Sequence, residues 1–171
     1  MWTLGLDIST KCVGWCTLTE TGEFVKVGHL DLSAEKGLYK KLDLFRSFFK
    51  RFDPDGYRVI VEAPLQRSNN QNVVNLLQRW NGMCCGVLYQ WFDLREPTLI
   101  EQRTALKELG IKVPKGVKGP DRKKYILQCV QGCDKIPESS WEVNRNGNPH
   151  AWCFDQADAY VIAKAGLKLG E

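Results

Sequence analysis

An aspartate inside the first predicted strand constrains this chain more than any other feature. Apolar and small residues alternate from Leu4 to Thr10 at the period of a β-strand, and Asp7 stands in the middle of that run. Burying a carboxylate in a sheet costs free energy, so this position indicates a functional residue. The alternative is an aspartate that only caps a turn.

Two more apolar runs follow the first after short breaks. They extend from Lys11 to Thr19 and from Phe24 to Leu32, with the polar turn Glu20-Thr21-Gly22-Glu23 between them. Short runs joined by turns of a few residues are typical of antiparallel hairpins. The sequence therefore predicts a three-stranded antiparallel meander with Asp7 near the centre of its first strand.

The rest of the chain alternates between helical and strand patterns. The expected elements are a helix that ends near Phe52 and has Ser33 as its N-cap, strands over 57–61 and 97–101, a long helix over 73–91, helices over 103–109 and 120–133, and a last helix over 151–169. A chain of 171 residues with 43% hydrophobic residues can bury one full core. We therefore expect a single α/β domain over residues 1–171.

Three more acidic residues fall at positions that resemble that of Asp7. Glu62 ends the strand over 57–61, and Asp155 and Asp158 stand three residues apart on one face of the last helix. Each has a simpler explanation, since a strand-end carboxylate reaches water and a helix dipole favours acids in the first turn. Together, however, they form an oxygen-only ligand set that suits Mg²⁺ or Mn²⁺. Two such ions about 4 Å apart promote attack of water on a phosphodiester, without a side-chain nucleophile.

Over almost its entire length, the sequence resembles the RuvC-like Holliday junction resolvases of the ribonuclease H superfamily. The resemblance rests on Leu-Gly-Leu-Asp7 with Gly14-Trp15 in the next strand, on Val-Ile-Val-Glu62, and on Asp155-Gln-Ala-Asp158-Ala. It implies a ribonuclease H-like fold, with a mixed five-stranded sheet that contains the meander and is flanked by helices.

The same resemblance implies a function. The chain would be a metal-dependent, structure-selective endonuclease that cuts branched DNA and resolves four-way junctions by paired nicks. Asp7, Glu62, Asp155 and Asp158 would hold two Mg²⁺ or Mn²⁺ ions per active site. The sequence also departs from the family, because Ile8-Ser9-Thr10 follows the first aspartate where Asp-Pro-Gly is frequent. Leu65 replaces a wedge aromatic found in bacterial members.

Basic residues are concentrated in one segment of the chain. The formal net charge is +4, and residues 101–125 hold eight basic and three acidic side chains. A nucleic acid is a natural partner for such a segment, although a solvated lysine-rich loop is the alternative. The resemblance implies catalytic lysines at Lys107 and Lys123. The remaining expected DNA contacts are Arg67, Arg103, Lys115, Lys118, Arg122 and Lys124.

The helix over 73–91 also bears on assembly. Its apolar residues cover more of its circumference than one sheet would bury, and Gly82 and Gly86 would let another backbone approach closely. A four-way junction has two equivalent strands to cut, so we expect a homodimer with this helix at its seam. The alternative is a helix that is wholly internal.

The expected location is the cytoplasm of a bacterial or phage-infected cell. No secretory leader pattern opens the sequence, and no apolar run reaches the ~18 residues of a membrane span. Seven cysteines, two of them adjacent at Cys84 and Cys85, favour reduced thiols over disulfides. A zinc site built from Cys129, Cys133, His150 and Cys153 is an alternative with loose spacing. Short, divergent relatives of this kind are typical of bacteriophages.

Other functions remain open at this stage. An RNA-processing nuclease, or one that acts on flaps and forks, would use the same carboxylates. An actin-like ATPase or sugar kinase also places an aspartate on an early hairpin, but that architecture needs a second domain. A nucleic-acid-binding protein without enzymatic activity would have no need of the acidic residues.

Overall fold

A mixed five-stranded sheet forms the centre of the computed structural model, which describes residues 1–133 and 136–170. The strands are β1 (Trp2–Ile8), β2 (Cys12–Leu18), β3 (Phe24–Asp31), β4 (Tyr57–Glu62) and β5 (Thr98–Ile100). Their order is β3-β2-β1-β4-β5, with β1, β2 and β3 antiparallel and with β4 and β5 parallel to β1. The predicted meander and mixed sheet are therefore confirmed.

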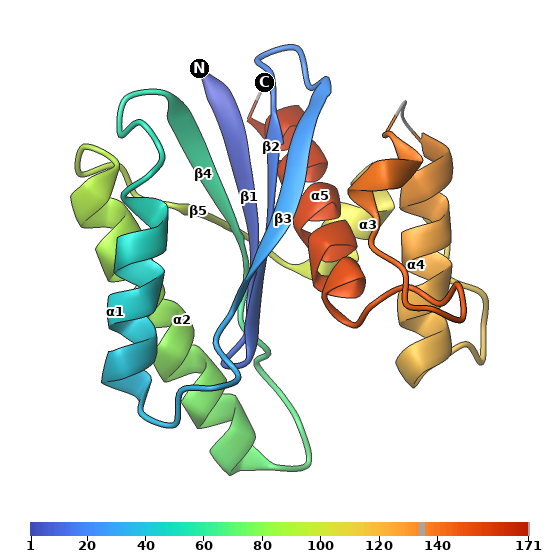
Figure 1. Ribbon diagram of the computed structural model, residues 1–171, viewed down its shortest axis with the longest axis horizontal. Helices are drawn as coiled ribbons and strands as arrows, with labels where there is room; N and C mark the ends of the chain where they lie inside the picture. The colour runs from blue at the N-terminus through green and yellow to red at the C-terminus, as the bar shows by residue number, and fades with distance from the viewer. Residues whose placement is uncertain (134–135, 171) are drawn as a thin grey trace.

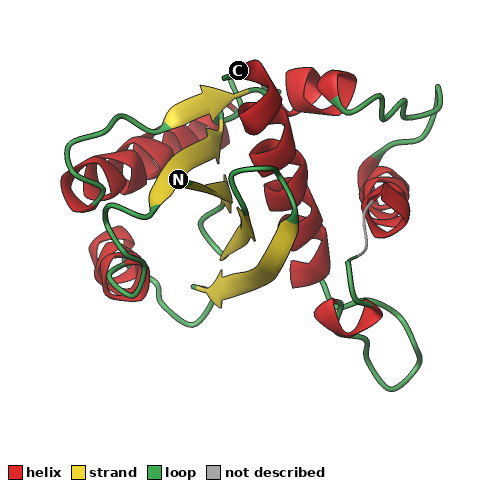
Figure 2. Ribbon diagram, turned by 90° about the horizontal axis from the view of Figure 1, so that it is seen from above, coloured by secondary structure: helices red, strands yellow, loops and turns green. Residues whose placement is uncertain are grey.

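Helices cover both faces of the sheet (Figures 1 and 2). One layer consists of α1 (Leu38–Phe49) and α2 (Gln71–Trp91). The other consists of α3 (Gln102–Glu108), α4 (Gly119–Cys133) and α5 (Trp152–Leu169), with a short 3₁₀ helix at Glu138–Ser140. Each layer closes its own hydrophobic core against the sheet.

The last helix, α5, lies directly on β1 and β2 because two glycines let it approach. A Cβ atom added at Gly5 would collide with the carbonyl oxygen of Ala159, and one at Gly14 would collide with that of Asp155. Most of α5 is therefore buried, which makes it the central helix of the fold. None of the helices in the described parts of the chain is both long and apolar enough to span a membrane.

The first helix begins later than the sequence predicts. Ser33 is not its N-cap, because the backbone N–H of Ser33 donates to the Asp31 carboxylate in a turn before the helix. Gly37 occupies the N-cap position without a side-chain cap. The helix also ends at Phe49, although Phe52 still packs with the core on this face through its ring contact with Phe49.

The long helix α2 begins two residues earlier than predicted, because the Asn70 side chain accepts hydrogen bonds from the first backbone N–H groups. It buries one side, including Trp80 and Cys84, against α1 and the sheet. Val73 and Leu76 remain exposed. The helix is therefore not wholly internal.

Candidate active site

The predicted carboxylates come from three elements that meet at one end of the sheet, the lower end in Figure 1. Asp7 lies near the end of β1, and Glu62 is the last residue of the neighbouring parallel strand β4. Asp7 also pairs with Gly14 of β2, and Gly14 packs under the backbone of Asp155. Close packing at this glycine brings the first turns of α5, with Asp155 and Asp158, over Asp7.

The four carboxyl groups influence one another strongly. Burial raises the pKa of Asp7 well above its usual value, and the charges of Glu62, Asp158 and Asp155 raise it further. Burial and the charge of Asp158 raise the pKa of Glu62 to about 8. Burial, with a further contribution from Asp155, raises the pKa of Asp158 to about 6. At neutral pH this cluster therefore retains protons, which a cation of sufficient charge would displace.

Two basic residues of α4 face this cluster. Lys123 Nζ lies 3.4 Å from Asp155 Oδ1. Burial lowers the pKa of Lys123, but the charges of Asp155, Asp158 and Asp7 outweigh it, so the pKa is raised. Lys123 and Arg122 in turn lower the pKa of both Glu62 and Asp158. The structure therefore places Lys123, one of the two predicted catalytic lysines, among the carboxylates.

A carboxylate-rich site needs enough free oxygen atoms to hold a cation. Glu62 Oε2 and Asp158 Oδ1 are buried and have no hydrogen-bond partner among the residues that the structure describes. Within residues 1–133 and 136–170, however, no three acidic, histidine or cysteine side chains are gathered closely enough to hold an ion as they stand. The donor set and its unpartnered oxygens fit Mg²⁺ or Mn²⁺, although the side chains do not form a finished coordination shell.

Two side chains at this site were not predicted from the sequence. The Gln102 side chain, at the start of α3, hydrogen-bonds to Asp158 and lowers its pKa. The thiol of Cys12 hydrogen-bonds to Asp155, and burial followed by the charge of Asp155 raises the pKa of this thiol. No signal in the sequence singled out either residue as part of the site.

The other predicted DNA-contacting residues lie around the site at different positions. Arg67 and Arg103 line a cavity of about 420 Å³ that begins at Glu62. Leu65 also lines this cavity and is half exposed. Lys115, Lys118 and Lys124 are exposed in the loop before α4 and on its first turns.

Lys107, the second predicted catalytic lysine, lines a different cavity from the one that begins at Glu62. This cavity lies between α3 and α4, and its wall also contains Arg122. A role for Lys107 in catalysis stays a prediction.

The zinc alternative gains no support in the part of the chain that the structure describes. The Cys153 thiol donates to the Glu142 carbonyl oxygen, and the His150 ring stacks on Trp152. Cys129 hydrogen-bonds to Tyr125. The side chain of Cys133 lies outside the described residues.

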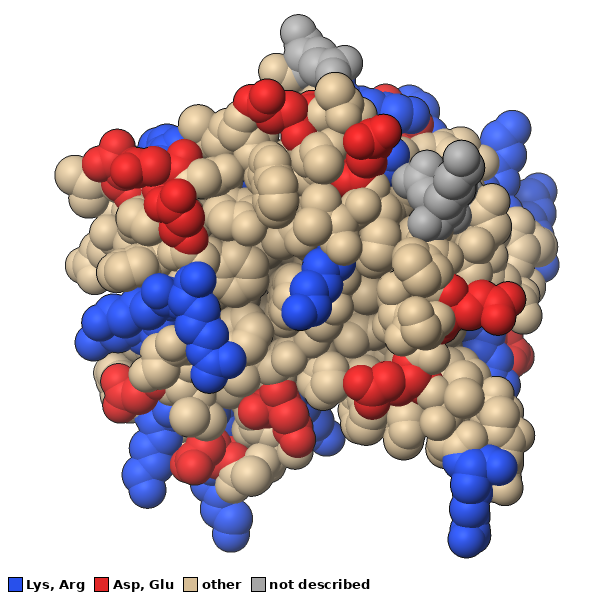
Figure 3. Space-filling model, turned by 45° about the horizontal axis from the view of Figure 1, so that its top comes forward, with Lys and Arg blue, Asp and Glu red and all other residues tan. Residues whose placement is uncertain are grey.

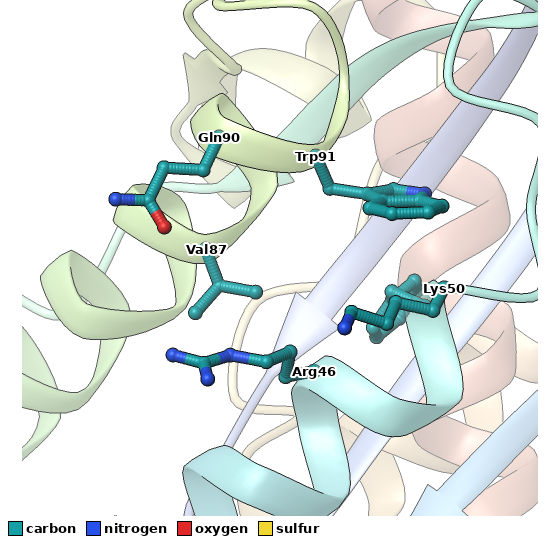
Figure 4. Close-up of a pocket in the computed structure, with 6 residues that line it drawn as sticks. Arg46, Lys50, Val87, Gln90 and Trp91 are labelled. Atoms are coloured by element: carbon teal, nitrogen blue, oxygen red, sulfur yellow. The ribbon is translucent and has the colours of Figure 1, made fainter.

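Other surface features are chemically unlike the carboxylate cluster. A cavity of about 340 Å³ between α1 and α2 is lined by basic, apolar and amide side chains, with Arg46 and Lys50 facing Val87 and Trp91 (Figure 4). On the face in Figure 3, Lys and Arg side chains are interspersed with Asp and Glu. The basic residues near the carboxylates are therefore the stronger candidates for contacts with a polyanion.

Comparison with known proteins supports the fold assignment. No family model and no curated protein matches the chain in sequence. Among solved structures, Thermus thermophilus RuvC is 16% identical with a TM-score of 0.62, and the match covers 99% of this chain and 97% of that one. RuvC from the same organism in complex with a Holliday junction substrate is 14% identical with a TM-score of 0.63, covering 99% and 95%.

The structure of a viral resolvase is also similar to this chain over nearly its full length. Fowlpox virus resolvase, in a complex with substrate Holliday junction DNA, is 14% identical with a TM-score of 0.55. The match covers 99% of this chain and 98% of that one. Agreement over nearly the full length of each protein, at such low identity, shows that the chain has the RuvC-like, ribonuclease H-like fold.

Proposed function

We propose that this protein is a metal-dependent endonuclease that cuts branched DNA and resolves four-way junctions by paired nicks. The observation that carries the proposal is the cluster of Asp7, Glu62, Asp155 and Asp158 at one end of a RuvC-like sheet, with buried oxygens that lack partners. The solved relatives with junction DNA support the choice of substrate. Basic residues flank the cluster on α3, on α4 and in the loop after β4.

The proposed cofactor is a pair of Mg²⁺ or Mn²⁺ ions held by these carboxylates. Such ions would supply an activated water molecule and neutralise charge on the leaving oxygen. The raised pKa values of Glu62 and Asp158 follow from burial and mutual repulsion, and the charge of a bound divalent cation would offset both effects.

Other side chains at the site would stabilise charge, orient the carboxylates and contact the DNA. Lys123 lies close enough to Asp155 to hold that carboxylate in place and to stabilise negative charge on the phosphate that is attacked. Gln102 would orient Asp158 through its hydrogen bond. Arg67 and Arg103 line the cavity beside Glu62, where they would contact phosphates of the DNA backbone next to the cleaved bond.

Paired nicks require two active sites, and α2 offers the surface for a homodimer. At 100° per residue, Gly82 and Gly86 lie on the side of α2 opposite Trp80 and Cys84. Among residues 1–133 and 136–170, nothing lies within 4 Å of a Cβ atom added at either glycine. A second α2 could therefore approach closely along this side.

The test is cleavage of matched DNA substrates by the purified protein. With Mg²⁺, it should cut a four-way junction at paired positions faster than three-way, flap or linear DNA of the same sequence. Asp158→Asn should bind the junction with unchanged affinity and should not cut it, because an amide cannot neutralise a divalent ion. Asp121→Asn, an exposed aspartate on the first turn of α4, is the matched control.

Two results would count against the proposal. Faster cleavage of flaps or of RNA would favour the flap/fork or RNA-processing alternative, which uses the same carboxylates. Junction binding without cleavage in Mg²⁺ or Mn²⁺ would leave only a structure-selective DNA-binding protein.

A further inference from the structure

The turn between β1 and β2 begins two residues after Asp7, where the sequence departs from the pattern of the RuvC-like resolvases. The backbone N–H and the hydroxyl of Ser9 both donate to the Cys12 carbonyl oxygen, at 3.0 and 2.8 Å. The Cys12 N–H donates in return to the Ser9 hydroxyl oxygen at 3.1 Å. Three hydrogen bonds between these two residues therefore fix the start of β2 relative to the end of β1.

The helices on one face of the sheet hold the same turn. The Trp80 indole N–H, from α2, donates to the Ser9 carbonyl oxygen at 3.0 Å, and the Lys41 ammonium group, from α1, donates to that of Thr10. Both of these side chains are buried. Hydrogen bonds to buried side chains restrict the movement of the turn, so Cys12 follows it at a defined position.

The Cys12 side chain reaches the opposite layer of helices, at the first turn of α5. Its thiol hydrogen-bonds to the Asp155 side chain. Lys123 of α4 binds the same carboxylate, with 3.4 Å between Nζ and Oδ1. Asp155 is therefore held by β2 as well as by α4. A carboxylate offers about four lone-pair sites, so these two donors leave room for a cation.

The chemistry of the two groups sets the direction of the hydrogen bond. A free thiol is protonated at neutral pH, and a neighbouring carboxylate favours the protonated form further. The S–H of Cys12 therefore donates and an oxygen of Asp155 accepts. A thiol is a weak donor, so this contact adds little to stability. What it supplies is an orientation for the carboxylate.

We infer that Cys12 is a positioning residue for the metal site, because its S–H holds the Asp155 carboxylate in the orientation that a bound cation requires. Ser9 contributes by fixing the backbone of Cys12. Loss of a group that orients a metal ligand typically lowers metal affinity or activity by about 10- to 100-fold. The inference rests on the proposed function, because it assumes that Asp155 binds a divalent cation.

The experiment measures the Mn²⁺ affinity of the protein without DNA, from the electron paramagnetic resonance signal of the free ion. Cys12→Ala removes the donor and should weaken Mn²⁺ binding by about tenfold or more. Cys12→Ser restores a donor and should bind within about threefold of wild type. Cys129→Ala, at a partly buried cysteine on α4, is the control and should bind as wild type does.

Two results of this titration would overturn the inference. Equal Mn²⁺ affinity in Cys12→Ala and wild type would mean that the thiol does not orient a ligand. Binding by Cys12→Ser as weak as that of Cys12→Ala would mean that residue 12 acts through its packing and not as a donor.

A spectroscopic measurement on the metal-free protein tests whether Cys12 acts through Asp155. The infrared S–H stretching band of Cys12 is the difference between the spectra of wild type and Cys12→Ser, so it does not depend on the folding of Cys12→Ala. A hydrogen bond to a carboxylate lowers the frequency of this band. The band should therefore move to higher frequency in the Asp155→Ala background, and an unchanged band would overturn the inference.

Failure of this inference can be told from failure of the proposed function. If wild type binds Mn²⁺ and cuts junctions while Cys12→Ala keeps its Mn²⁺ affinity, then this inference alone is wrong. If wild type neither binds Mn²⁺ nor cuts junctions, then the proposed function is wrong and the inference falls with it.

Discussion

Lys123 Nζ lies 3.4 Å from Asp155 Oδ1, and this contact joins α4 to α5 across the carboxylate cluster. Lys123 is half exposed, whereas Asp155 is mostly covered. A pair so open to water contributes little to stability, typically about 0–1 kcal/mol. Its importance would be chemical, because a cation at this position would face the phosphate that a water molecule is proposed to attack.

Replacing Lys123 by alanine should therefore slow cleavage much more than it weakens binding. We expect the single-turnover rate to fall by about 100-fold or more, the usual cost of removing a group that stabilises charge in the transition state. Lys124→Ala removes the neighbouring, exposed lysine and is the matched control. Equal losses of rate and affinity in Lys123→Ala would indicate a DNA contact and no catalytic role.

Without metal, the raised pKa of Glu62 should make the protein less stable as the pH rises. The folded protein holds this proton up to about pH 8, whereas the unfolded chain releases it near 4.5. The folded state therefore binds more protons across this window, so the free energy of unfolding falls as the pH rises through it. Glu62→Gln removes this effect and should be more stable than wild type by about 1–3 kcal/mol at pH 8.

Urea denaturation in EDTA at pH 5 and pH 8 measures this difference. The difference in the free energy of unfolding between Glu62→Gln and wild type should be small at pH 5 and largest at pH 8. Glu23→Gln, in the exposed turn before β3, should show no gap at either pH. Adding Mg²⁺ should stabilise wild type more than Glu62→Gln, since the variant has lost a ligand. A pH-independent gap would mean that Glu62 is not a buried, protonated group.

The loop before α4 should contribute to affinity and not to the chemical step. Lys115 and Lys118 are exposed there, so each would release counterions when it meets a phosphate. Replacing either one by alanine should reduce the slope of log affinity against log salt by about 1. Cleavage at saturating protein should be unchanged, and Lys36→Ala, an exposed lysine before α1, should leave the slope intact. An unchanged slope in both loop variants would exclude this loop from the interface.

Much of the site was predictable because its acidic residues stand at positions with a local signature. Asp7 interrupts an apolar strand, Glu62 ends one, and Asp155 and Asp158 share a helical face. Each signature lies within a few residues of sequence. The parallel pairing of β1 with β4 then brings the first two together.

The other features of the site could not be predicted from the sequence, because they depend on packing between segments that are distant in the chain. Gln102 and Cys12 reach the carboxylates only because the starts of α3 and of β2 are placed there by the sheet and by α5. The resemblance implied a catalytic role for both Lys107 and Lys123, yet the structure puts Lys123 beside Asp155 and Lys107 in the basic cavity between α3 and α4. The start of α1 was mispredicted because Ser33 forms a local turn with Asp31 in place of a helix cap.

The last prediction concerns the proposed homodimer. Gly82 and Gly86 are exposed on α2, on the side turned away from the sheet. A lysine at Gly86 would place a charge between two closely packed helices, and its side chain would also keep them apart. In a monomer the same lysine would point into solvent, and a helix tolerates lysine better than glycine. Gly86→Lys should therefore fold normally and fail to dimerise.

The effect of Gly86→Lys on cleavage distinguishes paired cutting by a dimer from nicking of one strand by a monomer. Light scattering at micromolar concentration should give a dimer for wild type and a monomer for Gly86→Lys. On a four-way junction in a supercoiled plasmid, wild type should make paired cuts that give linear DNA, whereas Gly86→Lys should give only nicked circles. Gly132→Lys, an exposed glycine near the end of α4, is the control and should behave as wild type. If wild type is a monomer even on the junction and still nicks it, then paired resolution is wrong and the protein is a single-strand nuclease selective for DNA structure.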